Sequence, residues 1–136
     1  MKLVLDTNVL IAAFIAKGLC HTLVEHCLRT HNVIVSEFIF QELREKLTQK
    51  FKYSAEDAQA VEDLLRPRMQ VVEPVALAMG VCRDPDDGQI LGTAIAGNAA
   101  CIVTGDKDLL TLGMFETVDI LLPRDFAAHE DRSASN

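Results

Sequence analysis

The chain opens with a short apolar run that leads directly into a carboxylate. Leu3, Val4 and Leu5 follow one another without an alternating polar residue, as in a strand that is buried on both faces of a sheet. Asp6 comes next, and a helical pattern of apolar residues begins near Asn8. Because ligands of open α/β sheets bind just outside the carboxyl ends of the strands, Asp6 is expected to lie at a ligand site.

Short apolar runs and helical patterns alternate along the rest of the chain. Further strands are predicted at residues 33–35, 69–72, 101–104 and 117–122. Helices are predicted between them, at residues 9–16, 20–29, 37–49, 55–66 and 88–98. Such alternation is typical of a parallel sheet with helices on both faces. We therefore predict an α/β fold with one doubly wound, Rossmann-like parallel sheet of five strands, in which Ser36 caps the helix at 37–49.

The length of 136 residues suits one domain with a hydrophobic core. We expect this domain to span residues 1–128, and the small, polar tail at residues 129–136 to be frayed. The net charge of -7 argues against a general affinity for phosphate backbones, and the absence of Trp disfavours binding by aromatic stacking. A nucleic-acid substrate would therefore be held by a metal ion or by a local basic patch.

The cysteines indicate a reducing compartment. The 4 cysteines show neither CxxC spacing nor the density of a disulfide scaffold. Cys27 and His31 have the spacing of a metal-binding pair, but no second pair joins them. The sequence contains no recognisable signal peptide and no apolar stretch of membrane-spanning length. We therefore expect a cytoplasmic protein that does not bind a membrane.

Acidic residues recur at the predicted carboxyl ends of the strands. Asp6 follows the first strand, Asp106 follows the fourth, and Glu42 lies in the helix after the second. The loop before the helix at 88–98 adds Asp84, Asp86 and Asp87. Carboxylates brought together there would repel one another unless they shared a cation, and hard oxygen ligands suit Mg²⁺ or Mn²⁺. Since such an ion binds phosphodiesters and activates water, metal-dependent phosphodiester hydrolysis is predicted.

Four segments, taken together and in this order, resemble one known family. They are Leu5-Asp6-Thr7-Asn8-Val9-Leu10, the helix that contains Gln41-Glu42-Leu43, Asp84-Pro85-Asp86-Asp87, and Val103-Thr104-Gly105-Asp106-Lys107-Asp108. These segments are similar to those of the PIN-domain nucleases, in particular the bacterial and archaeal members regarded as toxins of toxin–antitoxin pairs. The resemblance covers nearly the whole chain and leaves out only the tail.

This resemblance implies an endoribonuclease that uses Mg²⁺ or Mn²⁺ to hydrolyse phosphodiester bonds of single-stranded or structured RNA. The catalytic residues it implies are Asp6, Glu42, Asp87 and Asp106. The metal ligands it implies are Asp6, Asp87 and Asp106, with Asp108 as an accessory. The auxiliary residues are Asn8 and Thr104. The resemblance further implies a homodimer that pairs with a small antitoxin protein.

Each acid also has a purely structural explanation. Asp6 could cap the helix that follows it, and Asp108 could cap a short turn at residues 109–112. Glu42 could pair with Lys46 one helical turn further on. Asp84 and Asp86 compete with Asp87 for the third position, but they are more typical of loop and N-cap residues than of ligands. Only the register of the following helix favours Asp87.

Other functions are also open to a small α/β domain with an acidic pocket. A phosphoacceptor receiver needs an acceptor Asp at the end of the third strand and a Lys after the fifth, where this chain has Glu73 and Arg124. A phosphatase with a DxD pair is disfavoured by Asn8, and a catalytically silent PIN-like binding module is the remaining alternative. The basic residues near the middle helices form either a solvated face or an RNA contact: Lys46, Lys50, Lys52, Arg66 and Arg68.

Overall fold

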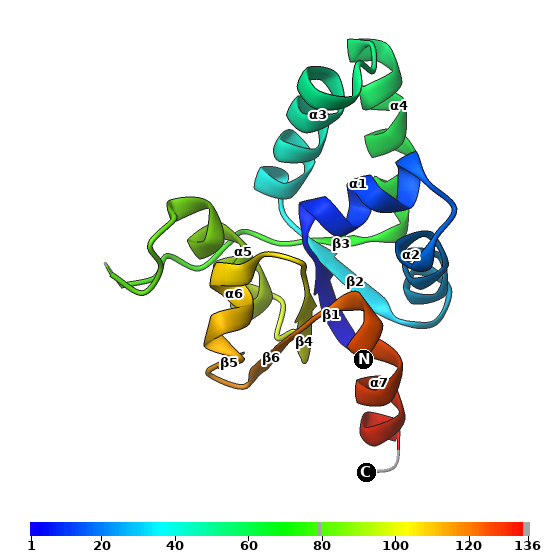
Figure 1. Cartoon of the computed structure of the whole chain (residues 1–136). Helices are drawn as coiled ribbons and strands as arrows, with labels where there is room; N and C mark the ends of the chain where they lie inside the picture. Colours follow the sequence, from blue (N-terminus) through cyan, green and yellow to red (C-terminus); the bar gives the residue numbers. More distant parts are fainter. Residues whose placement is uncertain (79, 135–136) are drawn as a thin grey trace.

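The computed structural model, which describes residues 1–78 and 80–134, is built around a central sheet (Figure 1). Its strands lie in the order β3-β2-β1-β4-β6-β5. The parallel strands are β1 (Lys2–Leu5), β2 (Asn32–Val35), β3 (Gln70–Val71), β4 (Cys101–Val103) and β6 (Val118–Leu121). The predicted doubly wound α/β fold is confirmed, and the strand order reverses between β1 and β4.

The sixth strand is not among the strands predicted from the sequence. β5 (Met114–Phe115) pairs antiparallel with β6, and the tight turn between them places Glu116 at a φ of 52°. Met114 and Phe115 lie between Gly113 and Glu116, without a longer run such as residues 69–72, which predicts the equally short β3. The sheet therefore has one more strand than predicted, and that strand is an antiparallel edge.

Helices cover both faces of the sheet (Figure 1). On one side α1 (Thr7–Ile15) packs against α2 (Leu19–Thr30) and α3 (Glu37–Phe51), and α3 packs against α4 (Ala55–Leu65). The chain crosses to the other side with α5 (Pro85–Ala96), which contacts β1 and β2. The remaining helical segments are the short turns η1 (Arg66–Arg68) and η2 (Pro123–Asp125), and α6 (Lys107–Leu112) and α7 (Phe126–Ala134).

The core lies between these layers and contains β1. Leu3, Val4 and Leu5 are each at most 1% exposed, which confirms a strand buried on both faces. Ser36 lies at the cap position of α3, but its side chain makes no capping hydrogen bond. It instead accepts a hydrogen bond of 2.9 Å from Thr93 of α5, which ties the two faces of the sheet together.

Helix α5 begins three residues earlier than the predicted start at Gly88. The Asp84 side chain accepts a hydrogen bond of 2.9 Å from the backbone N–H of Asp86 and caps the helix. Pro85 occupies the first turn, where a missing N–H costs no hydrogen bond. The sequence of the preceding segment, residues 75–83, predicts a short turn or helix. In its described residues this segment forms a turn at Gly80 and neither a helix nor a strand, and residue 79 lies outside them.

The sequence predicts a short terminal helix that begins at Pro123, followed by a frayed tail at residues 129–136. The structure has helical turns from Pro123 onward, but they continue through most of the expected tail. Helix α7 continues to Ala134, and residues 135–136 lie outside the described part of the chain. The helix is anchored by Phe126 and His129, which are 3% and 7% exposed. The composition of the tail hides this anchor, because one buried aromatic residue and one buried histidine are enough to dock two helical turns.

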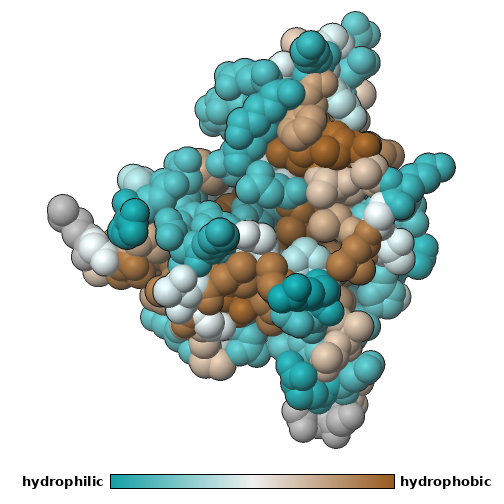
Figure 2. Space-filling model, in the orientation of Figure 1, coloured by the Kyte–Doolittle hydropathy of each residue, from teal (hydrophilic) through white to brown (hydrophobic). Residues whose placement is uncertain are grey.

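A hydrophobic groove of about 450 Å³ lies where α1, α2 and α4 meet. Ile15 and Leu64 line it with 45% and 56% of their surface exposed. Figure 2 shows brown, hydrophobic residues gathered in this part of the molecule, beside the hydrophilic surface of α3. Among the described helices none alone has the length and hydropathy to cross a membrane, and only α1 and α2 taken together, with a bend of 111°, would pass that test.

Candidate active site

Two neighbouring strands bring Asp6 and Asp106 to the same edge of the sheet. Asp6 follows β1 directly, and its backbone N–H donates to the carbonyl of Val103 in β4 at 3.0 Å. Asp106 comes three residues after Val103. The carboxyl ends of β1 and β4 meet at the point where the strand order reverses, so both acids lie at the expected ligand edge of the sheet.

Thr104 links these two acids. Its hydroxyl donates a hydrogen bond of 2.7 Å to Asp6 Oδ2 and accepts one of 2.9 Å from the backbone N–H of Asp106. The other Asp6 oxygen accepts from the N–H of Thr7 at 2.7 Å. Asp6 is thus both the cap of α1 and a member of the acidic site, because its two oxygens serve different partners.

A small cavity of about 140 Å³ opens at this edge, and eight of its nine lining residues are polar or charged. They are Asp6, Asn8, Glu42, Lys46, Asp84, Asp86, Asp87 and Asp106. The structure therefore brings together all four acids with predicted catalytic roles, from β1, α3, α5 and the loop after β4. Asp108 does not line this cavity. It lines an adjoining groove of about 300 Å³ that Asp87 also lines.

Asp87 is the acid of the middle loop that lies deepest in the protein. It is 6% exposed, whereas Asp84 and Asp86 are exposed and form the capping turn of α5. One oxygen each of Asp87, Asp106 and Asp108 lie within 4.8 Å of one another. The Asp87 side chain points inward beside Asp106. This is the acid that the register of the apolar positions in the following helix favours.

Burial and mutual repulsion perturb two of these carboxyl groups. Burial raises the pKa of Asp87 to about 7, with further contributions from hydrogen bonding to Asp106 and from the charges of Asp106, Asp84 and Asp6. Burial also raises the pKa of Asp6, although the Thr104 hydrogen bond opposes this shift. Without a cation the site therefore retains a proton near neutral pH, as expected of carboxylates crowded in a partly desolvated pocket.

This donor set fits a divalent metal ion. Asp6, Asp87 and Asp106 present only hard oxygen atoms, which Mg²⁺ and Mn²⁺ prefer, and a cation would replace the shared proton. The raised pKa values of Asp6 and Asp87 express first the cost of burying these carboxylates and then the cost of gathering their charges without a positive partner. Asp108 is placed to add an oxygen from the Asp87 side of the cluster.

Lys46 also lines the acidic cavity, although it is not among the site residues predicted from the sequence. Its ammonium group donates to Asn8 Oδ1 at 3.2 Å and lies 3.8 Å from Glu42 Oε2. The i,i+4 spacing predicts the contact with Glu42. The contact with Asn8 joins residues 38 positions apart and leaves no local signal in the sequence. Among the described residues that line the acidic cavity, Lys46 is the only one with a positively charged side chain.

Comparisons with known proteins identify the family of this fold. The family model described as PIN domain matches residues 2–108. The structure is similar to VapBC2 from Rickettsia felis bound to a DNA fragment from its promoter, with 18% identity, a TM-score of 0.62 and coverage of 88% of this chain and 97% of that chain. VapBC-1 from nontypeable Haemophilus influenzae has 18% identity and a TM-score of 0.64 over 91% of this chain and 99% of that chain.

FitAcB from Neisseria gonorrhoeae has 20% identity and a TM-score of 0.60 over 90% of this chain and 98% of that chain. At these identities the likeness establishes the fold. A comparison with curated proteins finds no match.

Proposed function

Because the chain belongs to the PIN-domain family, we propose that it is a divalent-metal-dependent endoribonuclease and the toxin of a toxin–antitoxin pair. The observation that most supports this proposal is the convergence of Asp6, Asp87 and Asp106 on one small cavity at the carboxyl edge of the sheet. The burial of Asp87 supports it as well, because the charged form is unfavourable there and the site favours either a proton or a cation.

Asp6, Asp87 and Asp106 hold Mg²⁺ or Mn²⁺ in this proposal, with Asp108 as an accessory ligand. When bound, the ion would supply Lewis-acid activation of the phosphodiester and lower the pKa of a water molecule. Glu42, which lines the cavity from α3, would orient the attacking water and accept its proton. Thr104 acts as a positioning residue, because its hydroxyl fixes Asp6 and the backbone of Asp106 at once.

Lys46 gives an acidic protein a local contact for a polyanion. A net charge of -7 disfavours nucleic acid as a partner over most of the surface. We infer that the Lys46 ammonium group, which contacts Asn8 and Glu42 and lines the cavity, binds a phosphate next to the scissile bond. RNA is then bound at the cavity by the metal ion and Lys46, and Asn8 acts as an auxiliary residue that orients the lysine.

The toxin assignment draws on the likeness to structures described as VapBC and FitAcB complexes. The hydrophobic groove between α1, α2 and α4 is a surface on which an apolar segment of a small antitoxin could lie, since Ile15 and Leu64 are exposed there. We place the protein in the cytoplasm, where its RNA substrate is found, and propose a homodimer as the functional form.

The nuclease proposal is tested by incubating the purified protein with a mixed RNA pool in the presence of Mg²⁺, Mn²⁺ or EDTA. We expect cleavage only with a metal ion, and loss of cleavage in Asp6→Asn with an unchanged circular dichroism spectrum. The matched control is Asp57→Asn, which changes an exposed acid in the first turn of α4. Full cleavage by Asp6→Asn, or by wild-type protein in EDTA, would refute the proposal, and sequencing the cut ends would define the RNA preference.

A further inference from the structure

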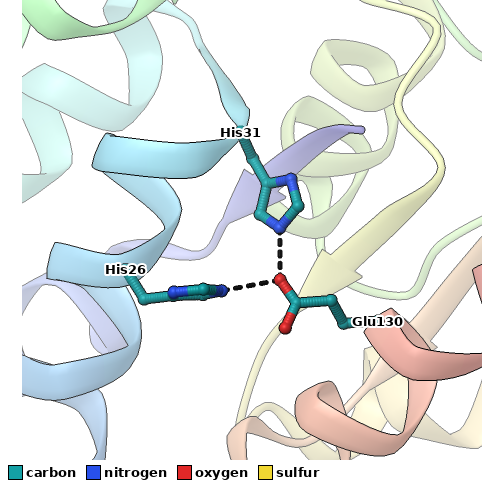
Figure 3. Close-up of side chains that lie close together, drawn as sticks. All are labelled: His26, His31 and Glu130. Atoms are coloured by element: carbon teal, nitrogen blue, oxygen red, sulfur yellow. Dashed lines mark hydrogen bonds and ion pairs between the residues drawn. The ribbon is translucent and has the colours of Figure 1, made fainter. Parts of the chain in front are cut away.

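A second cluster of metal-ligating side chains lies at the opposite edge of the sheet from the acidic cavity. His26 of α2 and His31, which ends that helix, both point toward Glu130 of α7 (Figure 3). The Nε2 atoms of His26 and His31 lie 2.6 Å and 2.5 Å from the same Glu130 oxygen, Oε2. Two of the chain's 4 histidines therefore meet one carboxylate across about a hundred residues of sequence.

The protein holds this cluster in place from several sides. The terminal amino nitrogen of Met1 lies 3.0 Å from His31 Nδ1, which leaves His31 Nε2 to face Glu130. The edge of the His31 ring packs on Phe126 at 6.0 Å between ring centroids, and on His26 at 5.6 Å. The side chain of His31 is only 12% exposed, so its orientation is fixed by packing rather than by solvent.

We propose that His26, His31 and Glu130 bind Zn²⁺. Two imidazole nitrogens and one carboxylate oxygen are a ligand set that zinc commonly takes, with a fourth position left for water. All three ligand atoms lie within 4.8 Å of one another. Bonds of about 2.0–2.2 Å to each ligand need only a small withdrawal of the carboxylate from the two rings. The Glu130 side chain is 26% exposed and has room for that movement.

The cluster and the acidic cavity differ in both place and metal preference. Met1 precedes β1 and Asp6 follows it, so the two sites are roughly 16 Å apart along the strand. The acidic cavity offers only oxygen ligands, which suit Mg²⁺ or Mn²⁺, whereas imidazole nitrogen favours zinc. The neighbouring Cys27 is fully buried in the core and is not available as a ligand.

A zinc ion at this position would fasten the C-terminal helix to the body of the domain. α7 supplies one ligand, and α2 with the turn that follows it supplies the other two. Binding to the folded protein stabilises it by mass action, because only folding brings Glu130 to the two histidines, from which it is 104 and 99 residues away in sequence. Zinc is therefore expected to raise the thermal midpoint independently of RNA cleavage.

The proposal is tested with untagged full-length protein titrated with Zn²⁺ by calorimetry, in excess Mg²⁺ so that the acidic cavity does not compete. We expect one saturable site per chain and a higher thermal midpoint in wild type. Affinity should fall at least tenfold in His26→Ala, His31→Ala and Glu130→Gln. Co²⁺ should give the visible absorption of a tetrahedral site in wild type and not in these three variants.

His21→Ala is the matched control, because His21 lies on the same helix, beside Glu25, outside the cluster. It should bind Zn²⁺ as wild type does. Absence of saturable binding in wild type would overturn the proposal, as would wild-type affinity in the cluster variants. If His31→Ala fails to fold by circular dichroism, His26→Ala decides the question, since the His26 side chain is 37% exposed and tolerates truncation.

Discussion

Thr104 and Asp6 are 98 residues apart in sequence and are joined by a buried hydrogen bond of 2.7 Å. The same hydroxyl accepts the N–H of Asp106. One small side chain at the end of β4 therefore fixes the relative position of two of the proposed metal ligands. This arrangement favours the role of Thr104 as a positioning residue for Asp6 and Asp106 over a purely local role at the strand end.

Thr104→Val should weaken the site without changing its charge. Valine has the same shape but cannot donate to Asp6 or accept from Asp106, so a buried carboxylate loses a partner, at a cost of about 1–3 kcal/mol in the free energy of unfolding. We expect Mn²⁺ affinity and RNA cleavage to fall roughly 10–100-fold, as is typical when the group that orients a ligand is removed. Calorimetry, cleavage rates and chemical denaturation measure these effects.

Thr104→Ser should restore most of the loss, because it returns the hydroxyl. The control Thr111→Val removes a hydroxyl on the exposed side of α6, which donates to the carbonyl of Lys107. Equal loss of activity in both valine variants would contradict a positioning role for Thr104.

The raised pKa of Asp87 makes the stability of the metal-free protein depend on pH. Its pKa is about 7 in the folded protein and near 3.8 in the unfolded chain, so folding favours the protonated form. This contribution is fully present below about pH 4 and is lost as the pH rises through about 7. Urea denaturation in EDTA should thus show a greater decline between pH 5 and about pH 8 in wild type than in Asp87→Asn.

In saturating Mn²⁺, the free energy of unfolding of wild type should no longer decline more steeply with pH than that of Asp87→Asn, because the metal ion replaces the proton. The metal affinity of wild type should rise with pH until Asp87 is ionised. Parallel stability curves for the two proteins in EDTA would show that Asp87 is not the group responsible.

Lys46→Ala should separate RNA binding from metal binding. Loss of one charge-assisted phosphate contact is expected to raise the KM for RNA about tenfold. Removing a cation from an acidic cavity should at the same time tighten Mn²⁺ binding. Lys50→Ala, on the exposed face of the same helix, is the control. Weaker Mn²⁺ binding in Lys46→Ala would indicate that the lysine supports the ligands and does not contact substrate.

Gly92 is required by the packing of the segment before α5. A Cβ at this position would lie 2.3 Å from the carbonyl oxygen of Val75, whose N–H bonds to the Gly92 carbonyl at 3.1 Å. Gly92→Ala should therefore lower the free energy of unfolding by about 1–3 kcal/mol, as overpacking does. Gly88→Ala on the same helix meets nothing within 4 Å and should instead stabilise by about 0.5–1 kcal/mol. Chemical denaturation of both variants gives the comparison, and equal stabilities would contradict it.

The sequence predicts the parts of this structure that have a local physical signature. The unbroken apolar run Leu3–Leu5 predicts a central strand, and the acid after it predicts a site at the sheet edge. The start of α5 is predicted too late because the apolar pattern begins only after Gly88, whereas the cap at Asp84 begins the helix. Capping is a side-chain contact and periodicity does not detect it.

The parts that the sequence does not predict depend on contacts between distant segments. Lys46 with Asn8, and the two histidines with Glu130, pair residues tens of positions apart. The polar composition of the tail favours fraying, yet Phe126 docks α7 on the domain. Such contacts follow from the three-dimensional course of the chain, and local patterns do not contain them.

The two outer strands of the sheet, β3 and β5, are each only two residues long. A strand this short exposes few unpaired backbone groups, so neither border offers much of a template on which another chain could extend the sheet. The domain is thereby protected against edge-to-edge aggregation at high expression. Association by strand addition is thereby disfavoured, which leaves the helices that cover both faces of the sheet as the larger contact surfaces.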